Sequence, residues 1–409
     1  MRVRMTSAAL ATLVVTSFVG GVMTLPGEAG EPAMPEGDYI VVLTDRTDPT
    51  RMASEHAQSH GARMMHIYRH ALRGYAAHLS AEAVAEIAAD PRVAFVQPDG
   101  VVSTMHQSQP TGIDRVDADL SPTAGIDGVD TQVDVDVAVL DTGVDLQHPD
   151  LNISRRKDCS TAERGVDDGN GHGSHVAGII GARDNNIGVV GVAPGARIWP
   201  IKVLDADGRG SFSDVICGID FVTGNAHKIE VANMSLGGSG LDKPCGGAEP
   251  DALHEAICAS VAAGVTYVVA AGNARFDASR TVPASYDEVI TVSALVDFDG
   301  KPGGAGGPTC RFETDDTFAE FSNYGADIDL IAPGLCILST WTNGGYNTIS
   351  GTSMSSPHVA GGAALYLANH PGASPAEVKA ALQAAGSGDW NNIDDPDGIK
   401  EPLLNVAGL

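Results

Sequence analysis

The chain has few positive charges, and most of that deficit is in lysine. Its 409 residues include 25 lysines and arginines, of which 7 are lysine, against 52 aspartates and glutamates, for a formal net charge of −27. An acidic surface repels a phosphate backbone, so the composition argues against nucleic-acid binding. It fits an ordinary acidic exported enzyme or one adapted to high salt, and it favours calcium.

Long hydrophobic runs are scarce, and the single candidate lies at the N-terminus. Arg2 and Arg4 precede an apolar run over residues 8–25, and small residues follow to Gly30. This order is typical of a secretory signal peptide. A retained membrane anchor is the alternative, because the run approaches the roughly 18 residues that a span needs. Thr, Ser and Gly dilute the run, so we expect residues 1–30 to direct secretion to the extracellular space, with no membrane contact after their removal.

No cysteine precedes residue 159, and all six lie in the later part of the chain. An even set in an exported protein predicts disulfides, with buried free cysteines as the alternative. Six cysteines permit fifteen pairings, among which sequence cannot choose. As a hypothesis, two pairs each bracket a loop and the third is what remains: Cys245–Cys258, Cys310–Cys336 and Cys159–Cys217.

Residues 36–105 have a pattern of their own, after a linker rich in Gly, Pro and Glu. Alternating or β-branched runs indicate strands, and Ser80 is a plausible N-cap for a helix. We expect a small ferredoxin-like α+β fold, with strands over 39–43, 72–79 and 93–102 and helices over 50–61 and 81–89.

Five of the 13 histidines lie in this segment. They can be surface residues without a role, or groups whose protonation near pH 6 charges a segment docked on another domain and releases it. The five are His56, His60, His66, His70 and His78.

From about residue 110, strand patterns alternate with helix patterns. This order predicts an α/β domain with a mostly parallel sheet flanked by helices on both faces. Functional residues of such sheets gather at strand C-termini and helix N-termini. Strands are expected over 133–140, 196–203, 229–235, 266–271 and 289–294, and helices over 173–180, 214–223, 251–263 and 354–369.

Three glycine-rich motifs carry the chemistry. They are Val-Leu-Asp-Thr-Gly-Val around Asp141, Gly-His-Gly-Ser-His-Val-Ala-Gly around His172, and Gly-Thr-Ser-Met-Ser-Ser-Pro-His-Val-Ala-Gly around Ser353. A serine attacks a carbonyl well when an imidazole takes its proton and a carboxylate orients that imidazole. Taken by itself, the Asp141 motif is also explained by a polar cap at the end of a strand, and the Ser353 motif by a helix N-cap. The order Asp, His, Ser also differs from that of chymotrypsin-like proteases and α/β-hydrolases.

These motifs resemble the subtilases, the subtilisin-like serine proteases, over nearly the whole chain. The resemblance implies a three-layer subtilisin-like fold for residues 106–409, with Asp141, His172 and Ser353 as catalytic triad. It also implies that Asn273 donates a hydrogen bond to the oxyanion, where the alternative is a turn asparagine. The substrate-binding residues it implies are Gly208, Gly210, Phe212, Ser235, Leu236, Gly237, Ala271 and Gly272.

Residues 36–105 resemble the inhibitory propeptide of many subtilases, including an ending of the type Val-Xaa-Pro-Asp. The resemblance implies that this segment assists folding and then inhibits its own enzyme, with its tail in the active-site cleft. We expect cleavage between Val102 and Pro110, near Met105–His106.

Calcium is the cofactor that the resemblance implies. Side chains of Gln107, Asp150 and Asn185 match ligands of the family's tight site, and the carbonyls of Arg183, Ile187 and Val189 would complete an oxygen shell. An ordinary Asn/Gly turn is the alternative. The acidic stretch 389–397 could hold a second ion or be a solvated loop.

His175 and His358 are interpreted as structural histidines, because the His-x-x-His spacing of His172 and His175 lacks a third ligand at helical spacing.

The functional hypothesis from the whole sequence is a monomeric secreted endopeptidase that acts on polypeptides with broad or apolar specificity. A triad esterase is one alternative, although the chain has no Gly-x-Ser-x-Gly elbow. An inactive peptide-binding homologue is the other.

Overall fold

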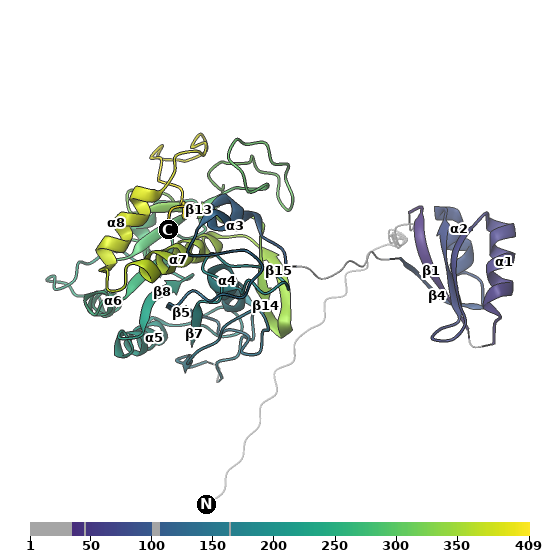
Figure 1. Ribbon diagram of the computed structural model, residues 1–409, viewed down its shortest axis with the longest axis horizontal. Helices are drawn as coiled ribbons and strands as arrows, with labels where there is room; N and C mark the ends of the chain where they lie inside the picture. The colour runs from purple at the N-terminus through teal and green to yellow at the C-terminus, as the bar shows by residue number, and fades with distance from the viewer. Residues whose placement is uncertain (1–34, 45, 100–106, 163–164) are drawn as a thin grey trace, which may run out of the picture. The chain divides into compact units, whose positions relative to one another are not determined.

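A computed structural model describes residues 35–44, 46–99, 107–162 and 165–409 (Figure 1). They form two compact units, one before residue 100 and one from residue 107 on. The expected signal peptide (1–30) and the expected cleavage site near Met105–His106 lie outside the described residues.

The smaller unit has a four-stranded antiparallel sheet in the order β2-β3-β1-β4. Residues of both helices join one cluster with alternate residues of the strands, so both helices cover the same face. This is the expected ferredoxin-like arrangement. Its elements are β1 (Gly37–Leu43), α1 (Pro49–His60), β2 (Arg63–Tyr68), β3 (Gly74–Leu79), α2 (Ala81–Ala88) and β4 (Val93–Pro98).

The ends of these helices follow from local chemistry. The Asp48 carboxylate accepts a hydrogen bond from the Arg51 amide before α1, and Gly61 ends that helix with a φ of 65°. Ser80 caps α2 as expected, by accepting from the Ala83 amide at 3.2 Å. Side-chain oxygens at such positions satisfy amides that have no partner within the helix.

The larger unit is built on a seven-stranded parallel sheet in the order β13-β12-β10-β8-β5-β7-β6. Its strands are β5 (Asp136–Asp141), β6 (Lys157–Asp158), β7 (Arg197–Lys202), β8 (Ile229–Met234), β10 (Thr266–Ala270), β12 (Ile290–Leu295) and β13 (Leu330–Pro333). The helices are α3 (Thr111–Arg115), α4 (His172–Gly181), α5 (Phe212–Gly224), α6 (Ala252–Ala262), α7 (Thr352–Asn369) and α8 (Pro375–Ala385).

Side chains of the central strands alternate between two buried layers. Val137 and Val139 of β5 pack in a cluster with α4 and α7, whereas Ala138 and Leu140 pack in a second cluster with α5 and α6. Both faces of the sheet are therefore covered, as Figure 1 shows. This confirms the predicted α/β class with helices on each side of a parallel sheet.

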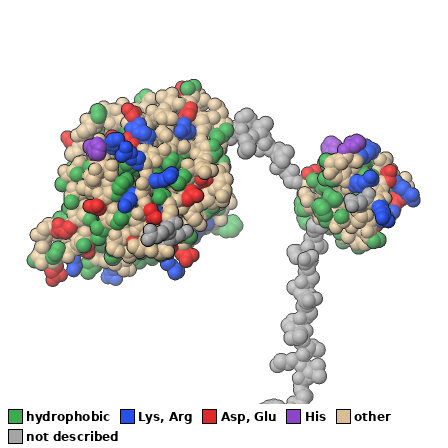
Figure 2. All heavy atoms as spheres, turned by 90° about the horizontal axis from the view of Figure 1, so that it is seen from below, with side chains coloured by type: hydrophobic (Ala, Val, Ile, Leu, Met, Phe, Trp, Pro, Cys, Tyr) green, Lys and Arg blue, Asp and Glu red, His purple; other side chains and the backbone are tan. Residues whose placement is uncertain are grey.

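Shorter elements surround this core. Two two-stranded sheets pair β9 (Gly238–Ser239) with β11 (Thr281–Val282) and β14 (Ile337–Trp341) with β15 (Gly345–Ile349), and three 3-10 helices are η1 (Ala118–Leu120), η2 (Ala278–Arg280) and η3 (Thr342–Gly344). Among the described residues, no helix is both long and apolar enough to cross a membrane. Figure 2 shows basic and acidic side chains interspersed over the visible face of the larger unit.

Candidate active site

Asp141 and His172 meet where a strand ends and a helix begins. Asp141 is the last residue of β5 and His172 the first of α4. Asp141 Oδ1 lies 2.7 Å from His172 Nδ1 and also accepts from the Thr142 amide at 2.7 Å. The Asp141 side chain is 1% exposed and that of His172 25%. The imidazole is thus fixed on one edge by a buried carboxylate and open on the other to solvent.

A close approach holds α4 against the end of β5. A Cβ at Gly173 would lie 2.0 Å from the Gly143 carbonyl oxygen and 3.1 Å from Asp141 Cβ. Only glycine leaves room there, because heavy atoms cannot approach so closely. The glycine beside His172 therefore sets the distance between the helix and the carboxylate.

Asp168 organises the loop before α4, and the sequence reasoning missed it. Its buried carboxylate accepts hydrogen bonds from Thr142 Oγ1 at 2.9 Å and from the amide and hydroxyl of Ser174 at 2.9 and 2.6 Å. It also accepts from the amides of Asn170 and Gly171. Asp168 lies before Gly171, the N-cap of α4, so no standard helix-start signal marks it in the sequence.

Ser353 lies in the first turn of α7, beside Asn273. Its Oγ donates to the Ser235 carbonyl at 3.2 Å. The Asn273 Oδ1 accepts from the amide and hydroxyl of Thr352 at 2.8 and 3.0 Å. Because both bonds use the amide oxygen, the amide nitrogen of Asn273 is left for other partners.

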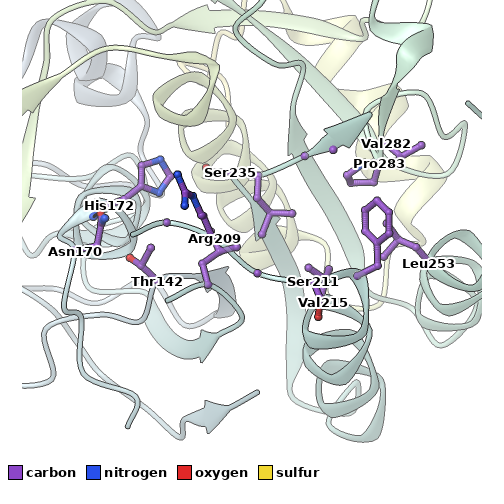
Figure 3. A pocket seen from close by; sticks show the side chains of 17 residues that line it. Thr142, Asn170, His172, Arg209, Ser211, Val215, Ser235, Leu253, Val282 and Pro283 are labelled. Carbon is purple, nitrogen blue, oxygen red and sulfur yellow. Dashed lines mark hydrogen bonds between the residues drawn. The ribbon is translucent and has the colours of Figure 1, made fainter. Parts of the chain in front are cut away.

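Two cavities meet at residues 235–238. A cavity of about 920 Å³ is lined by His172, and one of about 430 Å³ by Asn273 and Ser353. Figure 3 shows His172 at one end of the larger cavity and Leu253, Val282 and Pro283 at the other. The two cavities therefore share residues 235–238, and together they are lined by all three of these polar residues.

Seven of the eight expected substrate-binding residues line these cavities: Gly208, Gly210, Phe212, Ser235, Leu236, Gly237 and Gly272. Ala271 does not fit the expectation, because it is fully buried and clusters with Ala278 and Ile328. Ala270 lines the smaller cavity in its place. Ala271 follows the last residue of β10, and its side chain points into the core.

The residues expected to bind calcium gather around loop 183–189. Gln107 Oε1 accepts from the amides of Asn185 and Asn186 at 2.7 and 2.9 Å. Asp150 is fully buried, and its Oδ2 accepts from the Val189 amide at 3.0 Å. Burial is the main cause that raises the pKa of Asp150.

Asp150 Oδ1 has no hydrogen-bond partner although it is buried. A buried carboxylate oxygen without a donor is costly unless a cation compensates it. The atoms expected to bind the ion are all oxygens, which is the type of ligand that calcium prefers. Sequence reasoning missed Asp184, which is buried and accepts from Gln107 Nε2 at 2.6 Å, so it orients one of the expected ligands.

His175 and His358 lie in the core. His175 Nε2 donates to the carbonyls of Ile337 and Asn347 at 2.9 and 3.1 Å, and burial lowers its pKa to about 3. His358 Nδ1 donates to the Met354 carbonyl at 2.8 Å, and burial lowers its pKa to about 4. Both rings are neutral structural donors in this fold.

The structure contains three disulfides, and they are the pairs of the sequence hypothesis. Cys159 bonds to Cys217, and the other two bridges each close a loop, Cys245–Cys258 and Cys310–Cys336. No described cysteine is free.

Comparison with protein families gives two matches. The profile described as Subtilase family matches residues 133–397, and the profile described as Peptidase inhibitor I9 matches residues 38–105.

Individual relatives agree with these matches. An extracellular serine proteinase of a Thermus species (strain Rt41A) is 41% identical over 79% of this chain and 73% of its own length. Subtilisin E of Bacillus subtilis (strain 168) is 38% identical over 76% of this chain and 74% of its own. The crystal structure of a cold-adapted subtilisin-like serine proteinase superposes with a TM-score of 0.57, at 34% identity, over 72% of this chain and 97% of that one.

Proposed function

Because this chain belongs to the subtilase family of serine proteinases, with an I9 inhibitor segment before the enzyme domain, we propose that Asp141, His172 and Ser353 form its catalytic triad. The matches confirm the resemblance seen in the three motifs. The observation that carries the proposal is the 2.7 Å contact of the buried Asp141 carboxylate with His172 Nδ1, on the wall of the larger cavity.

The reaction proceeds through an acyl-enzyme. Ser353 Oγ rotates from the Ser235 carbonyl toward the imidazole and attacks the scissile carbonyl carbon, while His172 Nε2 takes the hydroxyl proton. The C–N bond then breaks, and the same proton passes to the leaving amine. In the second half, His172 takes a proton from water, whose oxygen attacks the acyl carbon and releases the acid and the serine hydroxyl. Asp141 stabilises the imidazolium in each half.

We assign the oxyanion contact to Asn273. Its oxygen is held by Thr352, and the residue lines the same cavity as Ser353. The amide nitrogen is then the donor available where negative charge develops on the substrate carbonyl.

The walls of the larger cavity support a broad or apolar specificity on polypeptides. Phe212 is half-exposed there, and Leu253, Val282 and Pro283 complete an apolar end. Glycines at 208 and 210 leave backbone groups accessible to an extended peptide, which recognises main chain more than side chains.

The zymogen proposal rests on the I9 match at residues 38–105. In this proposal, the segment inhibits the enzyme that carries it until the chain cuts itself near Met105–His106. Residues 1–30 direct secretion, in agreement with the extracellular relative from Thermus. The mature enzyme, residues 106–409, acts as a monomer.

Calcium is proposed for the loop around Asp150. Gln107, Asp150 and Asn185 would contribute side-chain oxygens, with carbonyls of Arg183, Ile187 and Val189. A bound ion would supply positive charge for the unpartnered Asp150 Oδ1. Chelator is expected to lower the Tm of the mature enzyme, and Asp150→Asn to abolish that difference, in calorimetry with and without calcium. An unchanged Tm would contradict a structural ion.

A fluorophosphonate probe tests the catalytic proposal. It should label the mature enzyme covalently and leave Ser353→Ala unlabelled, with Ser355→Ala as the matched control that keeps the nucleophile. Casein should be cleaved by the parent enzyme and not by Ser353→Ala. Labelling of Ser353→Ala would disprove the assignment of the nucleophile, and hydrolysis of short-chain esters without any cleavage of casein would favour the esterase alternative.

A further inference from the structure

Ionisable side chains are scarce in the two cavities of the active site. Among the described residues, none lines the smaller cavity, and the larger one is lined by two, His172 and Arg209. His172 carries no charge in the form that takes the serine proton. In that form Arg209 is therefore the one charged side chain that lines either cavity in the described part of the chain, although the whole chain carries a net charge of −27.

Arg209 belongs to a tight turn that follows β7, and hydrogen bonds fix its backbone. Its amide donates to Asp205 Oδ1 at 2.9 Å, and its carbonyl accepts from the Asp205 amide at 2.8 Å. The Asn170 side chain donates to the Ala206 carbonyl at 2.8 Å, which ties the turn to the loop before α4. The Arg209 side chain therefore begins at a set position beside the cavity.

The guanidinium of Arg209 is exposed and is directed along the cavity. Figure 3 shows the side chain pointing toward the end at which His172 lies. Within the described ranges, no hydrogen bond or ion pair joins this guanidinium to another side chain. Its N–H donors are thus open to a ligand that enters the cavity.

An arginine at this place discriminates between substrate side chains by charge. A guanidinium binds a carboxylate through two parallel hydrogen bonds, and it repels a lysine or arginine. The far end of the cavity, at Leu253 and Val282, is apolar. Because alternate side chains of an extended peptide point to the same side, one peptide can present an acidic and an apolar side chain to the same cavity.

We propose, on the basis of the peptidase function proposed above, that Arg209 determines specificity. It makes the enzyme prefer polypeptides with aspartate or glutamate close to the scissile bond, and it disfavours lysine or arginine at the same position. The observation that carries this inference is an unpaired cation on the His172 side of a cavity that is otherwise without charge in catalysis. Ion pairs between exposed side chains change equilibria by about two- to fivefold, which sets the size of the effect.

Isomeric peptides test the proposal on the mature enzyme. Each has one cleavable bond and a single Glu at a different position in a neutral sequence, so all feel the same long-range repulsion from the acidic chain. At one position near the bond, Glu should raise kcat/KM about two- to fivefold over Gln, and Lys should lower it by a similar factor. Both differences should shrink in 1 M NaCl, and mass spectrometry confirms that the same bond is cut.

Two variants assign the preference to Arg209. Arg209→Gln should remove the difference between Glu and Gln at that position, and Arg209→Glu should reverse it, so that Lys is favoured. Arg155→Gln is the matched control, because it changes the net charge as Arg209→Gln does and should keep the preference. Arg155 is exposed, and the neighbouring Ser154 amide donates to the Ile198 carbonyl near the start of β7, whereas His172 lies where β5 ends.

Equal kcat/KM for Glu, Gln and Lys at every position, in peptides that are still cleaved, would overturn the role of Arg209 and leave the peptidase function intact. A preference that persists in Arg209→Gln, or one that is lost in Arg155→Gln, would also overturn it, because another group or the overall charge would then be responsible. If the parent enzyme cleaves no peptide at all, the proposed function itself fails, and this inference fails with it.

Discussion

At His172, burial and charge act on the pKa in opposite directions. Burial lowers the pKa, but the charge of Asp141, the hydrogen bond to it and the charge of Asp168 together raise it above the ordinary 6.5. The base must be neutral to take the Ser353 proton. Because its pKa is raised, His172 becomes protonated at a higher pH than an isolated histidine does. The reaction therefore begins to slow at that higher pH as the solution is acidified.

The first prediction is the pH profile that follows. The acid limb of kcat/KM should lie above pH 6.5 and move to lower pH in Asp141→Asn, whose neutral amide no longer favours the imidazolium. In addition, kcat should fall by about 10⁴, because the wrong tautomer is favoured. Steady-state kinetics on a peptide substrate measures both. Asp167→Asn, a nearby carboxylate outside this contact, should keep the limb, and an unshifted limb in Asp141→Asn would refute the pairing.

The second prediction concerns Asn273. Asn273→Ala should lower kcat by about 10²–10³ with little change in KM, as loss of the corresponding donor does in subtilisin. Asn273→Asp keeps an acceptor for Thr352 but lacks the donor, so it should lose at least as much activity. Thr352→Val removes one of the two bonds to Oδ1 and should have a smaller effect. A KM effect without a kcat effect would point to substrate binding instead.

At the scale of elements, the helices and strands that carry the motifs were predictable. α4 begins at His172 and α7 at Thr352, within two residues of the expected ranges, because glycine-rich turns and apolar runs mark them. β2 was missed because it is an edge strand in which no residue is fully buried, so it lacks the hydrophobic alternation of a half-buried strand. β13 was missed because four residues are too short for a pattern.

α8 was missed although its signal is local. Ser374 and Glu377 form a capping box, with Pro375 in the first turn. A serine followed three residues later by glutamate is a recognisable helix start, and proline at the first position strengthens it. This element was therefore predictable from sequence.

The third prediction concerns α3, which Arg115 ties to the segment around Asp316. Arg115 is 4% exposed, and its removal leaves buried carboxylates without a cation. Arg115→Met should lower the free energy of unfolding by about 3–5 kcal/mol. Urea unfolding of mature Ser353→Ala protein measures it, with the exposed Arg155→Met as a control expected to change little. If Arg115→Met and the parent protein have equal free energies of unfolding, other groups compensate the negative charge of the buried carboxylates.

At the scale of the whole molecule, the histidines of the smaller unit differ in how far they are buried. His66 and His70 are exposed, as surface residues would be, whereas His56 is 3% exposed. His56 Nδ1 contacts the Tyr75 hydroxyl, and Nε2 lies 3.5 Å from Asp90. Burial lowers the pKa of His56; Asp90 opposes this, and His60 and Arg92 add to it.

The fourth prediction follows from that sign. Because the pKa of His56 in the folded state is below 6.5, its contribution to stability is fully present above pH 6.5 and is lost as the pH falls from 6.5 toward the folded pKa. The smaller unit should therefore become easier to digest as the pH falls below 6.5, and should show no change from this group above that pH. Limited proteolysis of full-length Ser353→Ala protein measures this, and His56→Gln should flatten the response.

His78 provides the matched comparison. Hydrogen bonds to Asp38 and Glu36 raise its pKa, so its effect on stability has the opposite sign. His78→Gln should leave the loss at low pH in place. A response to pH that persists in His56→Gln would assign the sensitivity to other groups.

The chemistry of this chain was readable from short motifs, because each motif keeps its residue type and its glycines within a few positions. The fold class was readable for the same reason, since strand and helix patterns are local. Which side chains are buried was not readable from the sequence, because burial depends on contacts between segments far apart in the chain. Only the folded chain distinguishes Ala270 from Ala271, buries His56 beside Asp90 and leaves the carboxylate of Glu401 without a partner.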